Sequence, residues 1–323
     1  TYPFVLLYTT LKHIMASVEQ FFEVNPTPDV LKEYAENIKS FIQTQLERGS
    51  RIALVTSGGT TVPLERNTVR YLDNFSEGRR GSSSAEEFVA AGYSVVFLHR
   101  KHSLQPYTRR FMTKARNFLD HLCLSEGEHI SVVPQYEEQV KAVFEEYNSA
   151  MSETKLLCIP YISVTDYLFF LKEISTAMRP IGKKGLVYLA AAVSDFYIPF
   201  DKLVEHKIQS KDNENGLNLH LEPIPKMLGT LTNEWAPDAF VISFKLETKD
   251  DLLEPKALGS LKSYNQNLVV GNLLRNHQDQ VILYSKDKPS VTISRTEEEK
   301  TGRIDIETRF IPAITDAHSK YME

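Results

Sequence analysis

The sequence predicts a three-layer, doubly wound α/β fold with a mostly parallel central sheet. Short apolar segments alternate with amphipathic ones along most of the 323 residues. Several of the short segments are apolar at every position, which is typical of strands that helices cover on both faces. No repeat, linker or low-complexity tract divides the sequence. We therefore expect one α/β domain of the Rossmann-like or ribokinase-like kind.

Strands are expected at short apolar runs that are bounded by turn residues. In chain order these runs occupy residues 52–55, 95–98, 156–159, 186–193, 240–244, 268–270 and 281–284, and residues 217–221 alternate between apolar and polar side chains. In a doubly wound sheet, ligands bind outside the carboxyl ends of the strands. The segments that follow the strands are therefore the first candidates for a site.

Helices are expected where apolar residues recur at helical spacing. Such patterns occupy residues 30–46, 136–147, 165–178, 251–264 and 306–314, and Gly49 is placed to end the first of them. Ser83 and Glu86 have the spacing of a capping box, which predicts that another helix begins there and ends near Gly92. Two basic clusters around Pro106 predict a loop at residues 100–110.

The charge balance and the cysteine count exclude several classes of protein. Lys and Arg number 37 and Asp and Glu number 42, so the formal net charge is −5, whereas a generic nucleic-acid binder is usually basic. No apolar run reaches the ~18 residues that a membrane span needs. The two cysteines, Cys123 and Cys158, are too few for a disulfide framework or a four-cysteine zinc site, and they suit a reducing compartment. We expect no nucleic-acid or membrane partner and a cytoplasmic location.

The first fourteen residues precede Met15 and contain a short apolar stretch without a basic flank, so a signal peptide is not expected. We expect residues 1–14 to be a disordered extension. The predicted domain spans residues 15–323. It has an N-terminal helical segment and a variable region at about residues 113–152.

The segment VTSGGTT, residues 55–61, follows the first predicted strand. Its glycine pair, Gly58 and Gly59, would let backbone N–H groups approach a ligand. The segment matches neither a P-loop nor a complete dinucleotide-binding fingerprint. A simple turn is the alternative interpretation.

The segment LDNFSEGRRG, residues 72–81, leads into a predicted helix. Gly78 and Gly81 relieve steric limits, and Arg79 and Arg80 add positive charge. The free N–H groups and the dipole of the helix that follows favour an anion. The alternative is a solvated basic loop with an ordinary helix cap.

Four more segments carry residues that could contact a ligand. LAAAVSDFY has three alanines that leave room for a ligand, and its Asp195 could accept from a ribose or amine or hold a metal. EHKIQS carries Lys207, ISFKLET carries Phe244 and VVGN carries Asn272. Close packing, solvation and core burial are the competing explanations for these residues.

Motifs for several other chemistries are missing. The sequence has no H-E-x-x-H motif, no close His/Cys cluster and no G-x-S-x-G elbow. A zinc site held by the protein and an α/β-hydrolase are therefore not expected. A site of glycine loops, Asn, Lys and one Asp suits the alignment and neutralisation of phosphates.

Taken together, the six segments resemble phosphopantothenoylcysteine synthetase, also called phosphopantothenate–cysteine ligase, in its eukaryotic and especially fungal form. The resemblance runs from about residue 52 to residue 272, and LDNFSEGRRG, LAAAVSDFY and EHKIQS are specific to the family as a set. It implies a two-step reaction of coenzyme A biosynthesis and a homodimer. The carboxylate of 4′-phosphopantothenate attacks the α-phosphate of a nucleoside triphosphate, and the cysteine amine then displaces the nucleoside monophosphate.

The resemblance also implies roles for single residues. Asn74 would handle the acyl intermediate, Lys207 would be needed to form the acyl-nucleotidylate, and Arg70 would reach a neighbouring subunit's site. The expected nucleotide-binding residues are Gly58, Gly59, Ser76, Gly78, Gly81, Phe244 and Asn272. The expected substrate-binding residues are Ala190, Ala191 and Asp195, and no metal-ligating residue is expected.

The resemblance further bears on the nucleotide and on partners. Bacterial members use CTP and carry two lysines on the helix before the last sheet strand, whereas counting back from Asn272 puts Ser260 and Tyr264 there. Eukaryotic relatives share that change and favour ATP, so we expect ATP rather than CTP. Mg²⁺ would accompany ATP, held mainly by phosphates and water. Bacterial chains often carry a fused decarboxylase, and in yeasts a separate one assembles with this enzyme, so such a complex is a further expectation.

Two other functions remain open at this point. An NADP-dependent oxidoreductase could use the glycine turn and hold the 2′-phosphate with His99-Arg100-Lys101, although the glycine fingerprint is incomplete. A non-catalytic nucleotide sensor could keep the fold alone. The presence of both Asn74 and Lys207 argues against a sensor.

Overall fold

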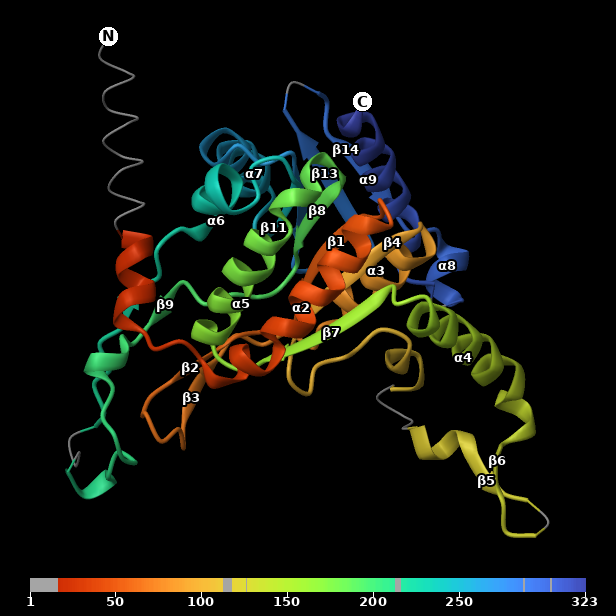
Figure 1. Ribbon diagram of the computed structural model, residues 1–323, viewed down its shortest axis with the longest axis horizontal. Helices are drawn as coiled ribbons and strands as arrows, with labels where there is room; N and C mark the ends of the chain where they lie inside the picture. The colour runs from red at the N-terminus through yellow and green to blue at the C-terminus, as the bar shows by residue number, and fades with distance from the viewer. Residues whose placement is uncertain (1–16, 113–117, 126, 213–215, 287, 303) are drawn as a thin grey trace.

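The computed structural model describes residues 17–112, 118–125, 127–212, 216–286, 288–302 and 304–323 (Figure 1). The predicted extension at residues 1–14 lies outside the described residues, as do residues 113–117 and 126 of the predicted variable region. No helix in these described ranges is long and apolar enough to cross a membrane.

A sheet of eight strands forms the centre of the described chain, in the order β14-β13-β12-β11-β8-β1-β4-β7. The neighbouring strands from β12 to β7 in this order are parallel, whereas β13 pairs antiparallel with β12 and β14 pairs antiparallel with β13. Their bounds are β1 Arg51–Ser57, β4 Tyr93–Arg100, β7 Leu156–Tyr161, β8 Gly185–Leu189, β11 Phe240–Glu247, β12 Leu268–Leu273, β13 Gln280–Ser285 and β14 Val291–Ser294. The predicted doubly wound, mostly parallel α/β fold is confirmed.

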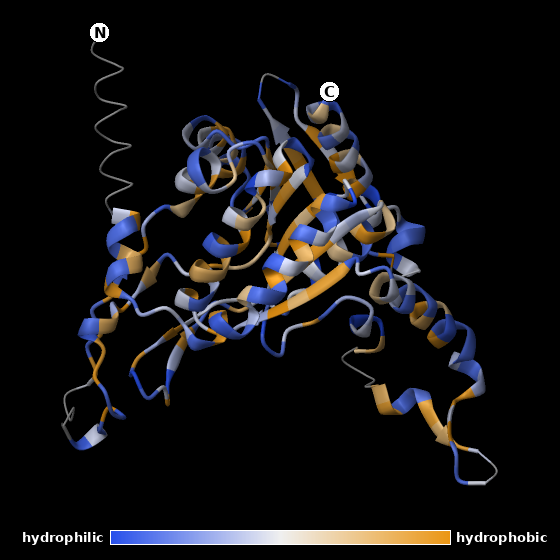
Figure 2. Ribbon diagram, viewed as in Figure 1, coloured by the Kyte–Doolittle hydropathy of each residue, from blue (hydrophilic) through white to orange (hydrophobic). Residues whose placement is uncertain are grey.

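Helices cover both faces of this sheet (Figures 1 and 2). They are α2 Asp29–Glu47, α3 Arg79–Ala90, α4 Glu137–Ser152, α5 Val164–Ala177, α6 Met227–Thr230, α7 Asp250–Tyr264, α8 Glu297–Thr301 and α9 Glu307–Met322. The central strand β1 shows why: Ile52 and Leu54 join the core with α2 and α5, whereas Ala53 and Val55 join the core with α3 and α9. A strand buried on both faces must be apolar at successive positions.

Three small two-stranded sheets lie outside the main sheet and were not predicted. Their strands are β2 Thr61–Pro63 with β3 Tyr71–Asp73, β5 Leu122–Leu124 with β6 Ile130–Val132, and β9 Phe196–Tyr197 with β10 Glu222–Pro223. The alternating residues 217–221 form no strand and only precede β10. Figure 1 shows the β5–β6 hairpin and α4 projecting away from the main sheet.

The predicted end of β8 and the predicted start of α3 are wrong. Strand β8 ends at Leu189 and not at residue 193, because the next backbone turns away and Ala191 donates its N–H to Thr56 Oγ1. Helix α3 begins at Arg79, so the predicted capping box lies inside it. Ser83 instead donates to Asp305, and Glu86 accepts from Arg109.

Candidate active site

Three of the motif segments meet where β1 and β8 end. Thr60 donates its N–H to the carbonyl of Ala192 and accepts the N–H of Asn74 at its own carbonyl, both at 3.0 Å. Ser194 donates its N–H to Thr60 Oγ1, also at 3.0 Å. The segments that contain the predicted glycine pair, Asn74 and the alanine run are therefore joined through one residue, at the carboxyl edge of the sheet.

The glycines of this region are explained by close packing. A Cβ on Gly59 would lie 1.5 Å from the carbonyl oxygen of Asn74, and one on Gly81 would lie 2.4 Å from Ser57 Cβ. Gly58 and Gly78 have φ of +86° and +82°, which residues with a side chain rarely adopt. These glycines hold the segments together, and their predicted nucleotide contacts remain predictions.

The N-terminus of α3 opens at the same edge without a capping side chain. Its N-cap is Gly78, and the first turn contains no acidic residue. Ser76 Oγ accepts the N–H of Gly78 at 3.4 Å, so this predicted nucleotide-binding residue shapes the entry to the helix. Free N–H groups at a helix N-terminus favour an anion. The arrangement agrees with the predicted phosphate site.

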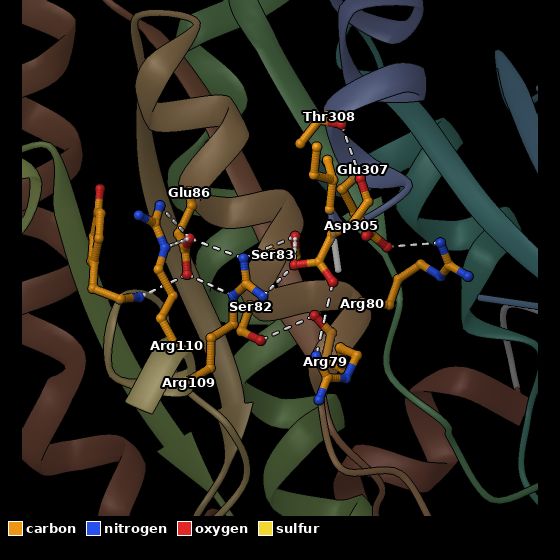
Figure 3. Close-up of polar contacts among 12 residues, drawn as sticks. Arg79, Arg80, Ser82, Ser83, Glu86, Arg109, Arg110, Asp305, Glu307 and Thr308 are labelled. Atoms are coloured by element: carbon orange, nitrogen blue, oxygen red, sulfur yellow. Dashed lines mark hydrogen bonds and ion pairs between the residues drawn. The ribbon is translucent and has the colours of Figure 1, made fainter. Parts of the chain in front are cut away.

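The arginines near this helix end form a network with acidic residues (Figure 3). Arg80 pairs with Glu307 at 2.7 Å, and Arg109 pairs with Glu86 at 2.6 Å and with Asp305. Burial raises the pKa of Glu307, although the neighbouring Arg80 opposes the rise. The network ties α9 and the loop after β4 to α3, and the charges of Arg80 and Arg109 are paired within the chain.

Phe244 and Asn272 lie on neighbouring strands and on the same face of the sheet as α3. Phe244 pairs in register with Val270, two residues before Asn272, and its ring packs edge-on against Tyr188 at 5.0 Å. Asn272 is buried, and its Oδ1 has no hydrogen-bond partner within the described residues. Leaving a buried polar atom without a hydrogen bond costs about 1–3 kcal/mol. The Asn272 oxygen is therefore a candidate to accept a hydrogen bond from a ligand.

The alanine segment has mainly structural contacts. Ala190 and Ala191 are half-buried beside the end of β1, and Ala191 donates to Thr56 Oγ1 at 3.1 Å. Asp195 is exposed, and its carboxylate pairs with Lys226 at 3.1 Å. The predicted substrate contacts of these residues stay predictions, because close packing also accounts for the alanines.

Arg70 and the Lys207 segment are joined by a buried carboxylate that the sequence did not reveal. Glu65 accepts hydrogen bonds from the N–H groups of Val69 and Arg70, and its Oε1 lies 2.9 Å from the Arg70 guanidinium. Arg70 also donates to the carbonyl of Ile208 at 3.1 Å. Burial alone would raise the pKa of Glu65, but the hydrogen bonds it accepts outweigh that effect and lower it.

These contacts hold residues 205–208 against the β2–β3 hairpin. Lys207 itself is exposed, and within the described residues its ammonium has no carboxylate partner. Arg70 is engaged in its own chain, so reaching a neighbouring subunit would require it to leave Glu65. No local pattern in the sequence distinguishes Glu65 from a solvated glutamate.

Ser260 and Tyr264 lie in the last turns of α7, next to the start of β12. Ser260 Oγ accepts from Gln266, and the carbonyl of Tyr264 accepts from Thr232. This is the edge of the sheet opposite the motif segments. The preference for ATP over CTP that these two positions suggest stays a prediction.

Among the described residues, no group of three or more His, Cys, Asp or Glu side chains could hold a metal ion. The Mg²⁺ expected to accompany a nucleotide stays a prediction.

Comparisons with known proteins identify relatives over nearly the whole chain. A family model described as the DNA/pantothenate metabolism flavoprotein C-terminal domain matches residues 172–307. The chain is 41% identical to the phosphopantothenate–cysteine ligase CAB2 of Saccharomyces cerevisiae, over 99% of this chain and 89% of the relative. It is 37% identical to the phosphopantothenate–cysteine ligase of Homo sapiens, over 92% of this chain and 96% of the relative.

A solved structure agrees with these sequence matches. A histidine-to-alanine mutant of Cab2 in complex with phosphopantothenate-cysteine matches with a TM-score of 0.86 and 42% identity, over 94% of this chain and 98% of that one. The coenzyme A biosynthesis bifunctional protein CoaBC of Thermococcus kodakarensis is 27% identical, over 74% of this chain and 46% of the relative.

Proposed function

The chain belongs to the phosphopantothenate–cysteine ligase family, and we propose that it uses ATP to join 4′-phosphopantothenate to L-cysteine in coenzyme A biosynthesis. The observation that carries the proposal is the 41% identity to a ligase of this name over 99% of the chain. The site geometry supports it, because the segments that carry the glycine pair, Asn74 and the alanine run meet beside the uncapped N-terminus of α3.

The proposed reaction has two steps. In the first, a carboxylate oxygen of 4′-phosphopantothenate attacks the α-phosphate of ATP, and the bond to pyrophosphate breaks. In the second, the amine of cysteine attacks the acyl carbon of the acyl-adenylate, and AMP leaves with the bonding electron pair. The amine loses a proton, and the product is 4′-phospho-N-pantothenoylcysteine.

The chain would contribute alignment and charge neutralisation. The first turn of α3 offers N–H groups to phosphate oxygens, and Lys207 would neutralise the negative charge that develops at the α-phosphate. Asn74 would donate from its amide to the acyl-adenylate, since this amide has no partner in the described residues. Mg²⁺ would add further charge neutralisation at the phosphates.

We propose that the protein acts as a homodimer. Large apolar side chains are exposed on and beside the β2–β3 hairpin: Val69 at 56%, Tyr71 at 52%, Leu72 at 41% and Phe75 at 85%. A cluster of exposed apolar residues marks an interaction surface, and two-fold dimers with an isologous interface are the commonest soluble oligomers. A partner that covers the hairpin would lie next to Asn74.

The proposal has two further parts. One is a complex with a decarboxylase, and the other is a cytoplasmic location. The bifunctional CoaBC relative is about twice as long as its match to this chain, which covers 46% of it. A separate decarboxylase would supply the part that this chain does not match. The two cysteines are both free, in agreement with a reducing compartment.

The oxidoreductase alternative is not supported. The relatives that cover nearly the whole chain are ligases. Two of the three residues proposed to hold a 2′-phosphate are poorly suited to it: Arg100 pairs with Asp73, and burial lowers the pKa of His99, which favours the neutral imidazole.

Pyrophosphate release tests the proposal. The purified chain is incubated with 4′-phosphopantothenate, cysteine and Mg²⁺, with either ATP or CTP. We expect one pyrophosphate and one AMP per product, and faster turnover with ATP. Faster turnover with CTP would overturn the nucleotide assignment, and NADPH binding without pyrophosphate release would favour the oxidoreductase.

A further inference from the structure

Two adjacent arginines, Arg79 and Arg80, begin α3 at the proposed phosphate site, and the proposed function assigns a role to neither. We propose that Arg79 binds the phosphates of the nucleotide, whereas Arg80 is a brace of the fold that does not contact ligand. The inference rests on the proposed function, because it takes the N-terminus of α3 as the place where the nucleotide phosphates bind.

Arg80 is fully engaged inside the chain. Its side chain is 15% exposed, and its NH1 lies 2.7 Å from Oε1 of Glu307, whose side chain is 5% exposed. Its NH2 donates to the carbonyl of His277, in the turn after β12. The guanidinium carbon lies 5.8 Å from the ring centre of Phe244 and 5.6 Å from that of Phe310.

Moving Arg80 to a ligand would therefore leave the Glu307 carboxylate buried and unpaired. Breaking a buried ion pair by removing one partner is strongly unfavourable. The contacts instead make Arg80 a link between the first turn of α3, the N-terminus of α9 and the turn that follows Asn272.

Arg79 is held only loosely. Its side chain is 45% exposed, and its NH1 lies 3.8 Å from Oδ1 of Asp305. The other oxygen of Asp305 already binds Arg109 and accepts from Ser83 at 3.2 Å. An exposed pair at this distance stabilises little, so Arg79 can leave Asp305 at small cost.

The position of Arg79 suits a phosphate ligand. It is the first residue of α3, and side chains on a helix tilt toward its N-terminus, which here is the open and uncapped end. Figure 3 shows Arg79 and Arg80 leaving the helix in different directions, Arg80 toward Glu307 and Arg79 away from it. A guanidinium can make two parallel hydrogen bonds to a phosphate, and a lysine cannot.

The test compares Arg79→Gln, Arg79→Lys and Arg80→Gln in the full-length protein. Arg309→Gln is the matched control, because Arg309 is 42% exposed and pairs with Glu299 in a contact with no part of α3. The readouts are KM for ATP, kcat from pyrophosphate release, the dependence of KM on NaCl, and Tm.

We expect Arg79→Gln to raise KM for ATP about 10- to 100-fold, as the loss of a charge-assisted contact implies. Its salt dependence should become shallower, with Tm unchanged. Arg79→Lys should give a smaller increase. Arg80→Gln should lower Tm and keep the wild-type salt dependence of KM, and the control should change neither quantity.

A KM for Arg79→Gln within twofold of the wild type, with the same salt dependence, would overturn the inference. So would a shallower salt dependence in Arg80→Gln alone. A wild-type protein that releases no pyrophosphate would instead count against the proposed function. Equilibrium binding of ATP to the same variants then decides whether Arg79 contacts the nucleotide.

Discussion

Asn74 and Lys207, the two side chains proposed for chemistry, keep their polar groups unpaired in the described chain. The buried glutamates of the same region are paired instead. Glu65, Glu86 and Glu307 are buried, and each has an arginine partner. The chain thus pairs its buried charges, which hold the segments in place, and leaves donors free where ligands are expected to bind.

Asn74→Asp should leave the fold intact and slow the second step. The substitution keeps the size of the side chain but removes the N–H donor and adds a negative charge beside the acyl-adenylate. Product formation should fall about 100- to 1,000-fold, as for the loss of a donor at an oxyanion, while a first turnover of pyrophosphate persists. Quenched-flow analysis of pyrophosphate and product measures both steps. Unchanged product formation would remove Asn74 from the mechanism. The control is Asn233→Asp, at an exposed amide that donates to the carbonyl of Gly229.

Lys207→Gln should block the first step. Without the ammonium, one cation that neutralises the negative charge developing at the α-phosphate is missing. Pyrophosphate release should therefore fall at least about 100-fold. ATP binding, measured by calorimetry, should change less. The matched control is Lys211→Gln, at an exposed lysine four positions on. Normal pyrophosphate release by Lys207→Gln would contradict this role.

At the scale of the elements, the segment that carries Asn74 depends on Gly59. An alanine there would put its Cβ 1.5 Å from the carbonyl oxygen of Asn74, so the backbone must shift. We expect Gly59→Ala to lower the free energy of unfolding by about 1–3 kcal/mol, the range for overpacking. Product formation should fall with it. Denaturant unfolding monitored by circular dichroism measures the effect.

Gly259 provides the comparison for that prediction. It lies inside α7, and a Cβ there would meet no heavy atom within 4 Å. Gly259→Ala should therefore stabilise the protein by about 0.5–1 kcal/mol, because alanine has the higher helix propensity. Equal effects of the two substitutions would show that the packing of Gly59 against Asn74 does not matter.

Most strands and helices could be predicted because their signals are local. The runs at β1 and β4 are apolar at successive positions, and the helix that became α5 has a continuous apolar pattern. The end of β8 could not be predicted, since Thr56 on a neighbouring strand turns the backbone at Ala191. The start of α3 was missed for a similar reason: Glu86 has its partners in Arg109 and Arg110, more than twenty residues away.

The candidate site was predictable only in part. The motif segments were found because the family motifs are continuous in sequence, and the structure brings the glycine pair, Asn74 and the alanine run together. Glu65 and Glu307 were missed, because nothing local marks a glutamate that is buried by residues distant in the chain. The expectation of ATP drawn from Ser260 and Tyr264 stays a prediction, because their place late in α7 does not show which residues face a nucleotide.

At the scale of the whole molecule, the net charge of −5 does not exclude an anionic ligand. The proposed phosphate site consists of backbone N–H groups at one helix end and a few local cations, and the network around Glu86 and Glu307 pairs most other arginines near it. Net charge describes the surface as a whole, whereas this site depends on local geometry.

The exposed apolar residues of the β2–β3 hairpin predict a dimer interface, and one charged substitution there should weaken the dimer. Val69 is 56% exposed, and Val69→Asp would place a carboxylate in the proposed interface. We expect a dimer in the wild type and a dissociation constant at least about tenfold higher in the variant. Sedimentation velocity over a concentration series measures it. Ile130→Asp, at a side chain 73% exposed on the projecting hairpin, should leave the dimer unchanged. A monomeric wild type would contradict this assignment.

The measurement that tests the central claim most directly is pyrophosphate release by the purified chain. It requires 4′-phosphopantothenate, cysteine, Mg²⁺ and ATP, with each component omitted in turn. The account predicts pyrophosphate and AMP in equal amounts with the ligated product, and no multiple turnover when either phosphopantothenate or cysteine is left out. Pyrophosphate release that does not depend on phosphopantothenate, or no release with either ATP or CTP, would contradict it.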